Sequence, residues 1–293
     1  MKVGIYGQSN NELTIKYANY LVELCLQNGI SVVFEENFYK GYIELNKGNE
    51  FKTFSEYSNL DRDISFFFTV GGDGTFLRSI TFIRDLNIPI IGINTGRLGF
   101  LATIQKEHIE VAFQKIISKK FVIQNRSLLC AQTLSKADDF NDLNFALNEI
   151  TITRKNTASM IKVNATLDEE FLTTYWSDGL IISTPTGSTG YSLSCGGPII
   201  SPTSKNIVLT PIAPHSLAVR PLVIPDNTDI NLQIDSRADE ILLTLDSRMY
   251  TLSNNSTVHI KKCPFSIKTV QLNDQTFIKT LREKLLWGED KRN

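Results

Sequence analysis

The chain has 293 residues, of which 42% are hydrophobic and 21% are charged, and its formal net charge is -1. This composition is ordinary for a globular protein, and the length is enough for about two domains. The small net charge argues against a broad basic surface for nucleic acid or for a membrane. No apolar run approaches the ~20 residues that are needed to cross a bilayer.

The cysteines and histidines are scattered along the chain. The four cysteines, Cys25, Cys130, Cys195 and Cys263, form no C-x-x-C pair, which favours reduced thiols over a disulfide framework. The three histidines lack metal-ligand spacing, so no structural zinc site is expected and no metal ligands are indicated. Strand-like residues follow Met1 directly and leave no room for a signal peptide, so we expect a cytoplasmic protein.

Residues 1–120 alternate strand and helix patterns, which is typical of an α/β domain with a Rossmann-like layered parallel sheet. Strands are expected at 2–6, 31–34, 64–70 and 90–93, and amphipathic helices at 13–25, 75–83 and 109–117. Residues 36–62 show no clear period, and we expect a loop there with no more than a short helix.

Residues 121–270 have a different texture, because short alternating runs are separated by Pro, Gly, Asn, Asp and Ser clusters. This pattern predicts an all-β domain of antiparallel strands, with a polar loop at 135–143. The strands are expected at 128–133, 145–153, 161–167, 179–183, 230–234, 241–245 and 257–261. The last part, 271–293, contains helical spacing at 276–287, and we expect this helix to pack back on the first domain.

The strongest single motif is Gly71-Gly72-Asp73-Gly74-Thr75, which lies on a strand-to-helix turn. Backbone N–H groups at the start of a helix carry partial positive charge, and glycine lets a phosphate approach the main chain. An aspartate in such a turn can hold a metal ion or accept a proton from an attacking hydroxyl. The alternative is a tight turn in which Asp73 caps the helix.

Three further segments concentrate polar groups at the ends of strands. Residues 94–99 form a second glycine turn that carries the guanidinium of Arg97, a natural phosphate ligand, and Arg78 lies one helical turn after Asp73. The pair Asn148-Glu149 interrupts an apolar run, which indicates either hydrogen bonding to a ligand or an edge strand with a bulge. Residues 177–192 surround a strand with small hydroxylated residues, a composition that suits phosphate or ribose and is also common in connectors.

Several common nucleotide and hydrolase motifs are absent. The sequence has no G-x-x-x-x-G-K-[ST] loop and no G-x-G-x-x-G after its first strand, which argues against a P-loop kinase and a dinucleotide-binding Rossmann fingerprint. The segment 186–190 has a G-S-T-G spacing but no histidine base placed to activate its serine. The chemistry therefore centres on the turn at Asp73.

In their order and combination these motifs resemble those of the bacterial NAD kinases. The resemblance rests on residues 71–75, 94–101, 148–149, 177–194 with 196–198, 214–217 with 220–221, and 281–288. The turn at 71–75 alone is shared with diacylglycerol- and sphingosine-type lipid kinases, whereas the long S-D-G-L-I-x-S-T-P-T-G-S-T block is far more specific. A lipid kinase and a non-catalytic NAD-binding sensor are the alternatives.

The resemblance implies transfer of the terminal phosphoryl group of ATP, or of polyphosphate, to the adenosine 2′-hydroxyl of NAD, which gives NADP. Asp73 would accept the proton of that hydroxyl. Residues expected to bind NAD are Asp73, Gly74, Arg78, Asn148, Glu149, Asp178, Thr189, Gly190, Tyr191, Ser192, Leu193 and Ser194. Candidate phosphate contacts are Gly71, Gly72, Thr75, Asn94 and Arg97. For Tyr191, stacking on the purine and a place in the core both remain open.

The resemblance also bears on cofactors, partners and departures from the family pattern. Because no P-loop lysine is present, Mg²⁺ or another divalent cation would have to neutralise the triphosphate. Family members are usually homo-oligomers, so a dimer or tetramer is expected, with NAD and ATP as substrates and no nucleic-acid or membrane partner. Ser159, Trp176 and Arg248 stand where many relatives carry other residues, so they are the weakest candidates for nucleotide contacts.

Overall fold

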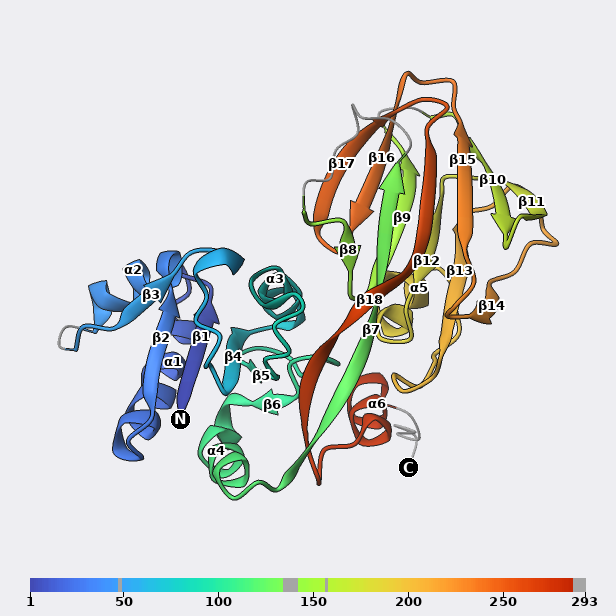
Figure 1. The fold of residues 1–293 in the computed structure, drawn as a ribbon. Coiled ribbons are helices and arrows are strands. Elements are labelled where there is room, and N and C mark those ends of the chain that lie inside the picture. Colours follow the sequence, from blue (N-terminus) through green and yellow to red (C-terminus); the bar gives the residue numbers. More distant parts are fainter. Residues whose placement is uncertain (47–48, 134–141, 156–157, 287–293) are drawn as a thin grey trace. The chain divides into compact units, whose positions relative to one another are not determined.

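The structure is a computed structural model that describes residues 1–46, 49–133, 142–155 and 158–286. It divides into two compact units (Figure 1): unit 1 comprises 1–125 and 267–293, and unit 2 comprises 126–266. Most of the polar loop expected at 135–143, and Trp287 at the end of the expected last helix, lie outside the described residues. No helix of the described residues is long and apolar enough to span a membrane.

Unit 1 is an α/β layer built on a parallel sheet with the strand order β5-β4-β1-β2-β3. Its strands are β1 (Lys2–Gly7), β2 (Ser31–Glu35), β3 (Lys52–Phe54), β4 (Phe66–Gly71), β5 (Ile90–Asn94) and the short β6 (Ile104–Gln105). Its helices are α1 (Glu12–Gln27), α2 (Glu36–Leu45), α3 (Asp73–Ile83), α4 (Ile109–Ile117), α6 (Phe277–Leu285) and the 3-10 turns η1 (Tyr57–Asn59) and η2 (Lys106–His108). The expected α/β domain is therefore confirmed.

The connections of this sheet place a change of direction between β1 and β4. The chain leaves β1 through α1 and returns at β2 on one side, whereas it leaves β4 through α3 and returns at β5 on the other side. In open parallel sheets, ligands bind at the carboxyl edge where the strand order reverses in this way. The turn after β4, which carries Asp73, lies at that edge.

Residues 36–62 contain more structure than the sequence predicted, namely α2, β3 and η1. The helix forms because Phe38 and Tyr42, one turn apart, are both buried against Phe34, with ring centroids 6.0 and 4.7 Å away. Glu35 caps it by accepting a hydrogen bond from the N–H of Phe38 at 2.8 Å. Two buried side chains on a ten-residue helix are too few to produce a clear period in the sequence.

Unit 2 is an antiparallel β unit with two sheets around one apolar core (Figure 1). One sheet has the order β14-β13-β12-β9-β16-β17, and the other contains β11, β10 and β15 next to β18. The elements within unit 2 are β8 (Phe145–Ala146), β9 (Glu149–Arg154), β10 (Ile161–Leu167), β11 (Glu170–Ser177), β12 (Gly179–Ser183), η3 (Gly187–Thr189), α5 (Tyr191–Ser194), β13 (Asn206–Ile212), β14 (Leu222–Pro225), β15 (Ile230–Asp235), β16 (Glu240–Leu245) and β17 (Arg248–Ser253). This confirms the all-β second part, although β11, β13, β14 and β17 were not among the expected strands.

Two strands, β7 (Phe121–Thr133) and β18 (Thr257–Leu272), are longer than predicted. Each has residues in both units. Within unit 2 they carry Cys130 and Cys263, whose Cα atoms lie 5.1 Å apart and whose thiols form a disulfide. The expectation of four reduced thiols was wrong for this pair, since strand pairing brings together residues 133 positions apart. Cys25 and Cys195 are free.

The last helix belongs to unit 1, as the sequence predicted. Thr276 caps α6 by accepting from the N–H of Lys279. Lys284 donates to the carbonyl oxygen of Leu98 at 2.7 Å, and its ammonium lies 5.4 Å from the ring centroid of Phe100. The helix therefore holds the segment that follows β5, and this segment also contacts Asp73.

Candidate active site

Asp73 is the first residue of α3, and its carboxylate is held by the backbone of the segment after β5. Oδ2 accepts from the N–H of Phe100 at 2.8 Å, and Oδ1 accepts from Leu101 at 3.1 Å and Ala102 at 2.9 Å. Three bonds of this kind fix the orientation of the carboxylate. The expected alternative role, a helix cap, is not what these bonds describe, since no capping bond from a side chain is present at the start of α3.

Glycine occupies each of the positions around Asp73 for a different structural reason. An added Cβ on Gly99 would collide with Asp73 Oδ1, so only glycine lets the carboxylate lie against this segment. Gly71 has φ +155°, and a Cβ there would collide with Thr75 Oγ1. The Cβ positions of Gly72 and Gly74 face open space, which leaves their backbone accessible to a phosphate.

Two candidate phosphate contacts are already engaged or enclosed. Asn94 is buried, and its side chain accepts from the N–H of Gly96 at 2.8 Å and donates to the carbonyl oxygen of Ala102 at 3.4 Å. Asn94 therefore shapes the segment that holds Asp73. Thr75 is buried, and its Oγ1 has no hydrogen-bond partner within the described ranges. Arg97 is exposed.

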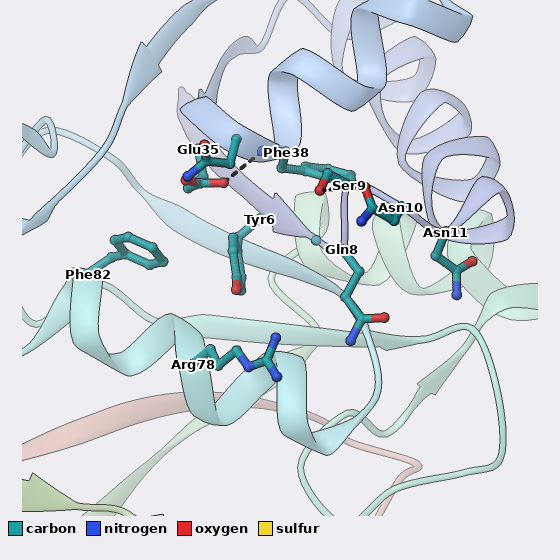
Figure 2. Close-up of a pocket in the computed structure, with 11 residues that line it drawn as sticks. Tyr6, Gln8, Ser9, Asn10, Asn11, Glu35, Phe38, Arg78 and Phe82 are labelled. Atoms are coloured by element: carbon teal, nitrogen blue, oxygen red, sulfur yellow. Dashed lines mark hydrogen bonds between the residues drawn. The ribbon is translucent and has the colours of Figure 1, made fainter. Parts of the chain in front are cut away.

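Arg78 lines a cavity of about 520 Å³ at the carboxyl edge of the unit 1 sheet. Figure 2 shows its guanidinium extending from α3 toward the space that Tyr6 and Gln8 reach from the end of β1. Glu35, Asn37 and the polar segment 8–11 complete the polar part of the lining. Segment 8–11 was not among the predicted site residues, although a run of Gln, Ser and Asn directly after a buried strand is a signal for it.

The Asn148-Glu149 pair lies in unit 2 where the chain changes sheet. The sequence predicted one strand over 145–153, but β8 pairs with β7 in one sheet, whereas β9 pairs with β12 and β16 in the other. The polar pair thus marks a crossing between sheets and not an edge strand. The carbonyl oxygen of Asn148 accepts from the N–H of Thr184 at 2.9 Å, which joins the crossing to the loop after β12.

Both side chains of this pair keep an unsatisfied polar atom. Asn148 Oδ1 and Glu149 Oε2 are shielded from solvent and have no hydrogen-bond partner in the described part of the chain. Glu149 Oε2 and the amide nitrogen of Asn148 face Gly190, because a Cβ added there would lie 3.0 Å from Glu149 Oε2 and 3.5 Å from Asn148 Nδ2. Burial, and then the neighbouring charge of Asp246, raise the pKa of the Glu149 carboxyl to about 8.

Some of the remaining unit 2 candidates form hydrogen bonds or ion pairs within the protein, and others are accessible. Asp178 forms an ion pair with Arg154, with Nε and Oδ1 3.0 Å apart, and Ser192 is buried with its hydroxyl 2.8 Å from that of Thr210. Tyr191 is 44% exposed, so it does not fill the core. Thr189 Oγ1 donates to the carbonyl oxygen of Thr186 at 3.2 Å, while Gly190, Leu193 and Ser194 are at least partly accessible.

The three weakest candidates differ in their surroundings. Trp176 is 50% exposed, and the Lys162 ammonium lies 5.0 Å from its ring centroid. Arg248 points inward and donates to the carbonyl oxygens of Leu143, at 2.8 Å, and Phe145. Ser159 is partly buried and has an interaction within the protein.

Comparison with known proteins identifies the class of protein. Residues 3–121 match the model of the ATP-NAD kinase N-terminal domain, and residues 147–272 match that of the ATP-NAD kinase C-terminal domain. These are the domains of a phosphotransferase. The chain is 53% identical to an NAD kinase of Christiangramia forsetii and 51% identical to one of Flavobacterium psychrophilum, and each alignment covers 100% of both chains.

Solved structures agree with this fold. The yeast NADH kinase complexed with NADH superimposes with a TM-score of 0.88 at 26% identity, covering 99% of this chain and 89% of that one. An NAD kinase from Archaeoglobus fulgidus in complex with ATP gives a TM-score of 0.75 at 24% identity, covering 98% of each chain. The chain belongs to the ATP-NAD kinase family.

Proposed function

We propose that this protein is an NAD kinase, which transfers the terminal phosphoryl group of ATP to the adenosine 2′-hydroxyl of NAD and releases NADP and ADP. The observation that carries the proposal is the Asp73 carboxylate, oriented by three backbone N–H groups and flanked by accessible glycine backbone. The full-length relatives at 53% and 51% identity support the same activity. Polyphosphate is the alternative donor.

In the proposed reaction Asp73 is the general base. It accepts the proton of the 2′-hydroxyl as that oxygen forms a bond to the terminal phosphorus, and the bond from phosphorus to the bridging oxygen of ADP breaks. Asp73 Oδ2 keeps a lone pair for this proton, because it accepts one backbone bond whereas Oδ1 accepts two. The accessible backbone at Gly72 and Gly74 would receive the transferred phosphoryl group, and the Arg78 guanidinium would pair with phosphate oxygens.

The unit 2 residues would bind the dinucleotide. Asn148 and Glu149 each have a buried oxygen without a partner among the described residues, and leaving such an atom unpaired costs about 1–3 kcal/mol. A ligand whose hydroxyl and amino groups donate to these oxygens would recover that energy. The exposed ring of Tyr191 supports stacking on the purine.

We further propose that the reaction uses Mg²⁺ or another divalent cation. Among the described residues no three His, Cys, Asp or Glu side chains form a metal-binding group. Such an ion would therefore be held mainly by phosphate oxygens of the donor and by water. When bound, the ion neutralises negative charge on the triphosphate. Excess EDTA should then abolish turnover, and added Mg²⁺ should restore it.

The direct test is a donor and acceptor matrix with purified protein. ATP with Mg²⁺, or polyphosphate with Mg²⁺, is incubated with NAD, NADH, diacylglycerol or sphingosine, and the phosphorylated product is quantified. We expect NADP formation with ATP and no lipid phosphorylation. Binding of NAD without turnover by any donor would indicate a sensor, and phosphorylation of a lipid would indicate a lipid kinase.

The oligomeric state of the protein and its location in the cell are two further proposals. A homo-oligomer, either a dimer or a tetramer, is expected from the family resemblance, and light scattering coupled to size-exclusion chromatography measures its mass directly. A cytoplasmic location is expected because a cytoplasmic pool of NAD and ATP would supply both substrates. Fractionation of cells that express the tagged protein at native level tests this location.

A further inference from the structure

The turn between β16 and β17 contains a buried aspartate. Asp246 follows Leu245, which pairs with Arg248 across the hairpin, and it adopts a left-handed backbone conformation with φ +52°. Only 2% of its side chain is exposed. A carboxylate in such a place needs hydrogen-bond donors, because burying an unpaired charge is very costly.

The donors come from the sheet crossing that carries Asn148 and Glu149. Asp246 Oδ2 accepts from the N–H of Leu147 at 2.9 Å, and Oδ1 accepts from Asn148 at 2.7 Å and Glu149 at 3.3 Å. The N–H of Asp246 in turn donates to the carbonyl oxygen of Glu149 at 3.0 Å. The Asp246 side chain therefore accepts hydrogen bonds from three successive backbone N–H groups, at the point where the chain passes from one sheet to the other.

Arg248 balances the charge of this carboxylate. Its Nη2 lies 3.8 Å from Asp246 Oδ2, its guanidinium carbon lies 5.1 Å from the ring centroid of Phe145, and it also donates to backbone carbonyl oxygens of the same segment. A guanidinium can make several such bonds at once because its donors are arranged in a planar fork. The hairpin thus holds residues 143–149 through both of these charged side chains.

The side chains of Asn148 and Glu149 take no part in this arrangement. Their backbone is fixed by Asp246, while Asn148 Oδ1 and Glu149 Oε2 stay without partners in the described part of the chain, and both side chains lie next to Gly190. Fixing the backbone and leaving the side chains unsatisfied keeps two polar groups ready for a ligand. Such preorganisation reduces the ordering that binding would otherwise require.

We propose that Asp246 is a positioning residue for NAD, which acts by orienting Asn148 and Glu149, with Arg248 as its counter-ion. This inference rests on the proposed function, because it assumes that NAD is the ligand of Asn148 and Glu149. Asp246 itself touches no substrate, and its effect on the nucleotide passes through the backbone of residues 147–149.

The decisive variant is Asp246→Asn. Asparagine adopts the left-handed conformation readily, so the hairpin turn is kept, but its amide can accept fewer of the three N–H groups. We expect the KM for NAD to rise at least tenfold while kcat at saturating NAD stays within threefold. The matched control is Asp168→Asn, since Asp168 also has positive φ in a hairpin and accepts a backbone N–H, that of Asp229, but is exposed. The control should change neither constant.

A second readout is the pH dependence of NAD binding, measured by calorimetry. The groups that face Glu149 are Asp246 and, behind it, Arg248 on the β16–β17 hairpin, together with the Tyr191 N–H and phenol on α5. If ligand donors bind the Glu149 carboxylate, affinity rises with pH toward the pKa of about 8. In Asp246→Asn the neighbouring negative charge is removed, so the midpoint should move to lower pH. This shift reports the charge of Asp246 beside Glu149, whereas the rise in KM with unchanged kcat reports its positioning role.

Asp246→Glu separates geometry from charge and remains informative if Asp246→Asn does not fold. The longer side chain keeps the negative charge but displaces the three acceptor contacts, so the KM for NAD should rise while the pH midpoint stays in place. If folded variants bind NAD as tightly as the unaltered protein, Asp246 is not a positioning residue. If the unaltered protein binds NAD but forms no NADP, the proposed function fails, and the binding comparison still tests Asp246.

Discussion

Two aspartates, one in each unit, each accept hydrogen bonds from three backbone N–H groups, but their surroundings differ. Asp73 accepts from residues 100–102 and keeps a partly exposed side chain beside accessible glycine backbone. Asp246 accepts from residues 147–149, its side chain is only 2% exposed, and Arg248 lies nearby. Among the described residues no ion pair involves Asp73.

The difference shows that the same hydrogen-bond pattern can serve either chemistry or positioning. Backbone donors fix the orientation of a carboxylate in both units, but only an accessible carboxylate can exchange a proton with a substrate. A buried one with an arginine instead fixes the segment that donates to it. Accessibility and counter-charge therefore separate the two roles.

The largest expected effect comes from Asp73→Asn. The amide cannot accept the hydroxyl proton, so NADP formation should fall by about 10² to 10⁴-fold. NAD binding should stay within about tenfold, which corresponds to ~1.4 kcal/mol. Initial rates of NADP formation and calorimetric titration with NAD measure the two quantities. Near-normal turnover by this variant would falsify the assignment of Asp73 as the base.

Gly99→Ala tests whether the position of the Asp73 carboxylate affects kcat. The added Cβ would collide with Asp73 Oδ1 and push the carboxylate from its backbone donors, so kcat should fall by up to about 10²-fold. The control is Gly29→Ala, because Gly29 has φ +65° and open space around its Cβ position. That variant should lose about 1 kcal/mol of stability with unchanged kcat. Equal kcat values for both variants would refute the steric argument.

Glu149→Gln should alter how stability depends on pH. The Glu149 pKa is raised from 4.5 to about 8 in the folded protein, so its contribution is full at low pH and is lost as the pH rises through this window. The loss is at most about 1.4 kcal/mol per pH unit. Glutamine does not titrate, so urea unfolding at pH 6 and pH 9 should show the variant gaining stability relative to the unaltered protein. Parallel pH profiles would contradict the buried, protonated carboxyl.

Much of the fold could be predicted from the sequence because the relevant signals are local. The strand that ends at Gly71 is a continuous β-branched and aromatic run, and the turn at Asp73 follows it directly. The last helix shows a clear apolar period. A short helix was allowed within 36–62, but the bounds of α2 were not predicted, because only Phe38 and Tyr42 anchor it and both pack on Phe34.

What could not be predicted depends on residues distant in the chain. The break between β8 and β9 is stabilised by Asp246, which lies 97 to 99 positions beyond the amides it accepts from. The Cys130–Cys263 pair is separated by 133 positions. In the candidate site, the polar pair at 148–149 was visible as an interruption of an apolar run, whereas the inward turn of Arg248 and the pairing of Ser192 with Thr210 had no local signal.

The smallest expected effect separates an engaged hydroxyl from an open ring within one loop. Ser192→Ala removes one partner of the buried hydrogen bond to Thr210, so stability should fall by about 1 kcal/mol while the KM for NAD stays within about twofold. Tyr191→Ala is the matched neighbour, and its exposed ring contributes little to the core. Loss of stacking worth about 0.5–1.5 kcal/mol should raise the KM for NAD by roughly two- to twelvefold with unchanged stability. Steady-state kinetics and urea unfolding of both variants measure the contrast, and a larger KM change in Ser192→Ala than in Tyr191→Ala would mean that NAD replaces the hydrogen bond to Thr210.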